Sequence, residues 1–276
     1  MGRESSSAAP PAVHAQSVIT TTTVLVESTT PPARTPTHAR EDPTAVPPAP
    51  VAVEQRQALV VALAGVELPG APVDPAPAAD PGTTVLHPVR EVVVFTEPGG
   101  PALARLPVRQ VLAPTWVPVV DRRPGWALVL LPGRPHPGGA APVGWVHLDG
   151  DVVLDEVDRR IVIDRGTLTV SVVADLARVS TSSPAAPATA PTSGVRSFVA
   201  VGATGTEGLP WLVGVLWPLV ASPTRICTGP LGGIGVPGLP ETSPLGTSTA
   251  DGCVDTPPSL RHALRTVPAG APVIIR

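Results

Sequence analysis

Short runs of β-branched residues, separated by Pro-Gly and Gly-Gly turns, fill the middle of the chain and limit most strongly what it can fold into. They occur in REVVVFTEPGG, in RQVLAPTWVPVVDRRPGWALVLLPG and in VGWVHLDG. Such runs, bounded by turn residues, are typical of strands. Within them, VPVVDRRPGWALVLL predicts a hairpin whose turn is Asp-Arg-Arg-Pro-Gly. About five short strands over residues 85–155 predict a small β-barrel.

Three tryptophans, Trp116, Trp126 and Trp145, recur at strand positions of this segment. The Gly-Trp strand and the late Gly-Trp-Val strand resemble those of bacterial SH3-like domains, which implies an SH3-like barrel over residues 85–155. Tryptophans exposed on such a barrel stack on sugars or peptides, whereas buried ones fill its core. We expect the core role, because the chain has no tyrosine and only two phenylalanines. His147 is expected to be a hydrogen-bonded or exposed strand histidine.

The N-terminal third of the chain differs in composition. Pro, Ser, Thr and Ala dominate residues 1–50, in a chain with 39 prolines among 276 residues. A segment of this kind buries too little apolar surface to offset its ordering entropy. We therefore expect a disordered arm, rich in Pro, Ala and Thr, over residues 1–84.

Within that arm, residues 56–80 have features of a signal peptide. An apolar run over residues 58–66 follows Arg56, is too short to span a bilayer, and precedes a small-residue Ala-Pro-Ala pattern. One interpretation is an export signal, with the true start of the protein near Val51 or Val53. The other is a short helix in a linker.

Charge and cysteine content argue against several classes of function. All 19 basic residues are arginine, and the formal net charge is −3, without a basic stripe. This pattern argues against nucleic-acid binding. The chain has two cysteines and six scattered histidines, without the spacing of a metal site. We expect no metal, no cofactor and a monomer.

Residues 156–276 begin a second region of alternating apolar residues. RRIVIDRGTLTVSVV predicts two strands joined by a turn at Gly166, and AGAPVIIR predicts a buried final strand. PSLRHALRTV predicts a helix, with His262 off its apolar face and therefore solvated. The residues on that apolar face are Leu260, Ala263, Leu264 and Val267.

The segment IGVPGLPETSPLGTSTADGCVDTPPSLRHALRTVPAGAPVII closely resembles the end of the L,D-transpeptidase (YkuD-type) catalytic domain. In outline, that family has I-x-I-H-G, a loop with a late Gly, S-H-G-C-V-R, a helix and V-P-x-G-T-P-V-x-I. The resemblance covers residues 157–276, and with the SH3-like segment it covers about 85–276. It implies a β-sandwich with one helix near the C-terminus. The expected fold is thus mainly β: a disordered arm, a small SH3-like barrel and an L,D-transpeptidase-type domain.

The resemblance also implies a chemistry. In this family a cysteine attacks a peptide carbonyl of a peptidoglycan stem, D-alanine leaves, and an amine of a neighbouring stem takes the acyl group. This makes Cys253 the candidate nucleophile and Gly252 a candidate backbone donor to the oxyanion, with Gly238 as the glycine of the His-Gly pair. It further implies peptidoglycan stem peptides as partners, and the cell envelope or the exterior as location. The motif His, Ser, His and Arg are replaced by Pro237, Ala250, Asp251 and Asp255.

These replacements predict impaired catalysis. Proline has no titratable group, and the carboxylates of Asp251 and Asp255 disfavour the thiolate of Cys253. We expect an impaired or inactive relative of L,D-transpeptidases. The alternatives are a non-catalytic module that binds cell-wall peptide, a decayed gene product without a selected role, and an active enzyme whose base lies elsewhere.

The second cysteine, Cys227, lies in RICTGP upstream of the motif. In an oxidising compartment it could form a disulfide with Cys253 and remove the nucleophile. The alternative is two buried, unpaired thiols. Thiol titration of the unfolded, unreduced protein distinguishes the two.

Overall fold

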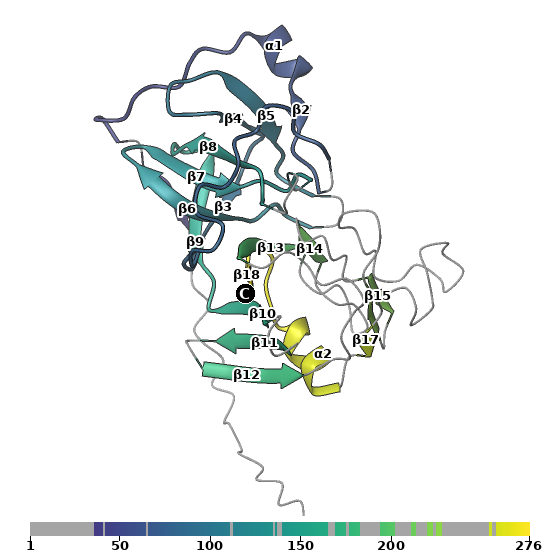
Figure 1. The fold of residues 1–276 in the computed structure, drawn as a ribbon. Coiled ribbons are helices and arrows are strands. Elements are labelled where there is room, and N and C mark those ends of the chain that lie inside the picture. The colour runs from purple at the N-terminus through teal and green to yellow at the C-terminus, as the bar shows by residue number, and fades with distance from the viewer. Residues whose placement is uncertain are drawn as a thin grey trace, which may run out of the picture. The chain divides into compact units, whose positions relative to one another are not determined.

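Strands make up most of the regular structure, as the turn-punctuated runs of the sequence predict (Figure 1). The described residues form three sheets and two helices, which confirms a mainly β protein with few helices. The computed structural model describes residues 36–40, 42–64, 66–110, 113–134, 136, 140–164, 169–174, 177–182, 194–201, 211–213, 220–222, 225–227, 254–255 and 258–276.

The first sheet has nine strands in the order β1-β9-β3-β6-β7-β8-β4-β5-β2. Neighbouring strands are antiparallel, except that β2 runs parallel to β5. The strands are β1 (Thr37–His38), β2 (Val60–Val61), β3 (Thr84–Pro88), β4 (Val92–Phe95), β5 (Ala102–Leu106), β6 (Val117–Arg123), β7 (Trp126–Leu130), β8 (Val143–His147) and β9 (Val152–Glu156).

The hairpin of β6 and β7 has a tighter turn than the sequence predicts. β6 continues through Arg123, which pairs with Trp126, so that Pro124 and Gly125 alone make the turn. The expectation of a turn starting at Asp121 is wrong, because Asp121 already pairs across the hairpin with β7. Gly125 has φ +69°, a conformation that glycine adopts without steric cost.

Tryptophan side chains fill the core of this sheet. Trp126 is fully buried and Trp145 is 6% exposed, which confirms the expected core role for these two residues. Phe95 packs edge-to-face on Trp126, with ring centroids 5.4 Å apart. Trp116 is half-buried and stacks on His87, so it also has a packing partner.

Part of the expected disordered arm packs against the nine-stranded sheet. β1 pairs with β9, a short helix α1 (Val53–Ala58) leads into β2, and Ala62 is fully buried in the core. The indole N–H of Trp126 donates a hydrogen bond to the carbonyl of Val46 at 2.7 Å. The expectation of disorder is therefore wrong for the described residues of the arm between 36 and 84. These residues are ordered because the sheet supplies apolar contacts that the arm cannot make within itself. Residues 1–35 lie outside the described part.

The second sheet has six strands in the order β12-β11-β10-β18-β13-β14. The chain's last strand, β18, lies between β10, to which it is parallel, and β13, to which it is antiparallel. The predicted hairpin is present as β10 and β11, and its expected turn at Gly166 lies outside the described residues. The strands are β10 (Arg159–Asp164), β11 (Thr169–Ala174), β12 (Ala177–Ser182), β13 (Val195–Val201), β14 (Trp211–Val213) and β18 (Pro272–Ile275).

The predicted C-terminal helix and final strand are both confirmed. α2 (Pro258–Arg265) lies beside β11 and β12 (Figure 1). Leu264 is 1% exposed and Ala263 4%, whereas His262 is exposed, as the helical period predicts. Val273 of β18 is fully buried.

A buried ion pair joins the segment before β3 to the second sheet. The guanidinium of Arg196 in β13 donates two hydrogen bonds to the carboxylate of Asp74, at 2.7 and 2.8 Å. The side chains are 3% and 0% exposed, respectively. Phe198 of the same strand belongs to the core cluster of the nine-stranded sheet. The two sheets therefore share a packed boundary, to which residues upstream of β3 contribute.

Candidate functional site

Most residues of the predicted catalytic motif lie outside the described part of the chain. These are Pro237, Gly238, Ala250, Asp251, Gly252 and Cys253. Asp255 lies on β17 (Val254–Asp255), and Cys227 ends β16 (Arg225–Cys227). With β15 (Val220–Ser222), these strands form a three-stranded antiparallel sheet in the order β15-β16-β17.

The register of β16 and β17 relates the two cysteine-bearing segments. Ile226 pairs with Val254, and Arg225 pairs with Asp255. In the sequence, Cys227 directly follows Ile226, and Cys253 directly precedes Val254. The register thus brings together the two segments named in the disulfide hypothesis, which itself stays a prediction. It also places Arg225 opposite Asp255, the residue predicted to stand at the arginine position of the motif.

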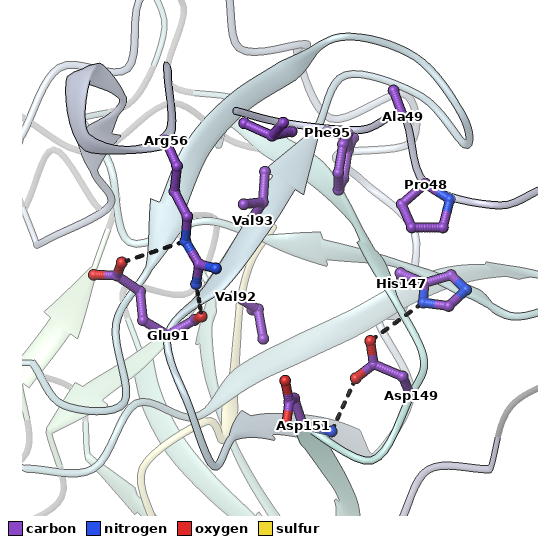
Figure 2. Close-up of a pocket in the computed structure, with 11 residues that line it drawn as sticks. Pro48, Ala49, Arg56, Glu91, Val92, Val93, Phe95, His147, Asp149 and Asp151 are labelled. Carbon is purple, nitrogen blue, oxygen red and sulfur yellow. Dashed lines mark hydrogen bonds and ion pairs between the residues drawn. The ribbon is translucent and has the colours of Figure 1, made fainter. Parts of the chain in front are cut away.

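A different site is formed on the nine-stranded sheet, where an open pocket of about 220 Å³ lies beside the arm (Figure 2). Valines and a phenylalanine of β4 line its apolar side, and charged residues lie around them. Its lining residues are Pro48, Ala49, Val51, Arg56, Glu91, Val92, Val93, Phe95, His147, Asp149 and Asp151.

One wall of the pocket is an arginine–glutamate cluster. Arg56 of α1 donates to the main-chain carbonyl of Glu91 and lies 4.0 Å from its carboxylate. Arg105 of β5 reaches the same carboxylate at 3.3 Å and donates to the carbonyl of Leu59 at 3.2 Å. These bonds fix α1 and the start of β2 against β4 and β5. Arg56 remains 44% exposed and faces the pocket (Figure 2).

The opposite wall is built by the turn between β8 and β9. The ring of His147 is hydrogen-bonded through Nδ1 to a carboxylate oxygen of Asp149, at 3.3 Å. The other oxygen of Asp149 accepts the backbone N–H of Asp151 at 2.9 Å. The His147 ring also packs edge-to-face on Trp126, with centroids 5.1 Å apart. His147 is thus a hydrogen-bonded strand histidine, as expected.

The side chains that line the pocket are apolar, acidic, one imidazole and one guanidinium. Its lining residues include no serine, cysteine, threonine, lysine or tyrosine, so no hydroxyl, thiol or amine side chain faces it. It instead combines an apolar floor with three carboxylates and one guanidinium. Across the described ranges, no group of three or more His, Cys, Asp or Glu residues is placed to hold a metal ion.

Sequence patterns alone do not indicate Arg56, Glu91, Asp149 or Asp151 as site residues. A local signal exists for one wall, because His-Leu-Asp-Gly-Asp places a carboxylate two residues after His147 at the end of a strand. The wall of Arg56 and Glu91 has no such local sequence signal, because these two residues come into contact only when the arm packs against the sheet. Neither α1 nor α2, the described helices, has the length and apolar character needed to cross a membrane.

Comparison with known proteins gives no relative for this chain: no protein-family model, no curated protein and no solved structure matches it.

Proposed function

We propose that this chain is an L,D-transpeptidase-like protein of the cell envelope whose cysteine acyl transfer is impaired. The observation that carries the proposal is the replacement of the base-type histidine by Pro237, within a segment that otherwise keeps the spacing of the family motif. Without a base, the thiol of Cys253 is not converted to the thiolate that attacks a carbonyl. Peptidoglycan stem peptides are the proposed partner, bound without efficient crosslinking.

The arrangement of the described strands supports this proposal at the ends of the resembling region. The hairpin β10–β11 opens it, and helix α2 followed by β18 closes it, in the order that the resemblance implies. The proposal extends to the domain plan, in which the nine-stranded sheet is an SH3-like unit and the second sheet is part of a transpeptidase-type sandwich.

Acylation by a carbapenem tests the proposal, because these drugs acylate the active cysteine of the family. The reduced, folded full chain is incubated with the drug, and its intact mass is measured. We expect no drug-sized adduct. An adduct mapping to Cys253 would show an activated thiol and would refute the impairment.

A variant that restores the motif tests the family assignment separately. Its four substitutions are Pro237→His, Ala250→Ser, Asp251→His and Asp255→Arg. We expect this variant to gain an adduct that disappears when Cys253→Ala is added. A folded variant that gains no adduct would count against the transpeptidase resemblance rather than against the impairment.

A further inference from the structure

The arm segment over residues 43–51, PTAVPPAPV, starts with a turn, and its part from Val46 to Pro50 is restricted by its sequence to an extended conformation. Proline fixes φ near −65° and pushes the residue before it towards the β or polyproline II region. These two effects cover every residue from Val46 to Pro50. Ala52, which follows, has φ −61° and ψ 152°, close to polyproline II values. The prolines also lack an N–H, so the segment is poorly suited to pair as a strand.

The segment contacts the sheet through side chains and one indole. Trp126 donates its indole N–H to the carbonyl of Val46 at 2.7 Å. Pro48 and Ala49 line the pocket together with Phe95 and His147, both of which pack edge-to-face on Trp126 (Figure 2). We call the surface made by Phe95, Trp126 and His147 the Trp126 face.

Two turn glycines allow this close approach. A Cβ placed on Gly125 would lie 2.2 Å from the Cβ of Ala45, and one on Gly99 would lie 2.7 Å from a methyl of Val46. The segment therefore lies directly on the β6–β7 turn and on the turn after β4. An extended, proline-rich chain held by an aromatic surface and an indole donor is the arrangement by which folded domains bind proline-rich peptides.

We propose that the Trp126 face is a binding site for extended, proline-rich peptides, and that residues 43–51 occupy it as an intramolecular ligand. A partner peptide keeps this extended, proline-rich backbone and has small or aliphatic residues at the positions of Ala45, Ala49 and Val51, which pack against the core, whereas Val46, Pro47 and Pro48 are exposed. Beyond Pro48 the pocket continues to Asp149 and Asp151, whose side chains are 34% and 45% exposed. Both carboxylates already have partners: Asp149 is hydrogen-bonded to His147, and Asp151 lies 3.6 Å from the guanidinium of Arg90.

The covalent link gives the intramolecular segment an advantage over any free peptide. A short linker produces an effective concentration on the order of millimolar, so a free peptide competes only when the segment is weakened. Ala45→Glu does this, because the half-buried Ala45 side chain faces the Gly125 turn. Ala52→Glu makes the same change at an exposed position and is the matched control.

The readout is hydrogen exchange of the Trp126 indole N–H, followed by NMR in the full chain. In Ala45→Glu we expect exchange to accelerate by at least roughly tenfold, with the dispersed spectrum of the folded sheet retained. A synthetic peptide of residues 42–56 then restores protection, and the same peptide with both Pro47 and Pro48 changed to alanine does not. The wild type and Ala52→Glu, at the same peptide concentration, show no change.

A milder variant, Pro47→Ala with Pro48→Ala in the chain itself, guards against a folding failure of Ala45→Glu. It releases the fixed backbone without adding charge, and we expect it also to admit the peptide. If both variants lose the dispersed spectrum, the segment is part of the core and the proposal is wrong. An exposed indole that the peptide fails to protect would equally overturn it.

Discussion

At the scale of single residues, Asp42 organises the turn that starts the arm segment. One oxygen of its carboxylate accepts the hydroxyl of Thr44 at 2.6 Å and the backbone N–H of Thr44 at 2.8 Å. The hydrogen bond from the Thr44 hydroxyl, and to a smaller extent the one from the Thr44 backbone N–H, lowers the pKa of Asp42 below its ordinary value of 3.8. Desolvation raises this pKa by a smaller amount. Both bonds stabilise the charged carboxylate.

The sign of this shift predicts how the turn responds to pH. Because the folded-state pKa is depressed, the contribution of the turn is present above the ordinary value of 3.8 and is lost as the pH falls through the lowered pKa. Thr44→Val removes the hydroxyl but keeps the backbone donor. We expect it to raise the pKa of Asp42 part of the way back, as measured by NMR titration of the carboxyl carbon. Thr37→Val on β1 is the control, and equal shifts in both variants would contradict this account.

At the scale of elements, the Asp74–Arg196 pair fixes the segment before β3 to β13. Asp74 also donates its backbone N–H to Ala141 and accepts the N–H of Ala76. Its carboxylate is therefore held in place by its own loop as well as by Arg196. A buried, bidentate pair of this kind is costly to break from one side, because the remaining charge stays desolvated.

Asp74→Ala is therefore expected to lower the free energy of unfolding by about 3–5 kcal/mol, as measured by urea denaturation. Asp80→Ala is the matched control, because Asp80 pairs with Arg160 but is 55% exposed, and its loss should cost about 0–1 kcal/mol. Adding Arg196→Met to Asp74→Ala should recover much of the loss by removing the unpaired charge. Similar costs for the two single aspartate variants would refute the importance of burial.

Local sequence patterns predict the elements that depend on them, and fail where order comes from distant contacts. The helix at Pro258–Arg265 and the hairpin of β10 and β11 follow from apolar period and alternation. The order of residues 42–51 does not, because it depends on Trp126 and on Gly125, about 80 residues away. The pocket has the same limitation, since Arg56 and Asp149 come from opposite ends of the first sheet's sequence.

At the scale of the whole molecule, the signal-like segment 56–80 forms part of the folded protein. Ala62 is fully buried, Leu68 is 6% exposed and packs against Gly133, and Ala71 is 6% exposed. Among the described residues, Asp74 is the only one whose carboxylate accepts hydrogen bonds from the guanidinium of Arg196. Cleavage after the Ala-Pro-Ala pattern would remove all four residues. It would leave a cavity in the first core and an unpaired charge between the sheets.

We therefore expect the folded protein from its native source to retain residues 42–80. A start near Val51 would remove the partner of the Trp126 indole, and burying an unsatisfied donor destabilises by about 1–3 kcal/mol. N-terminal sequencing, together with intact-mass measurement, checks this expectation, and the N-terminus should lie upstream of Asp42. A folded native product that begins after Ala78 would contradict it. In that case export would proceed by removal of the segment, and Arg196 would need another partner.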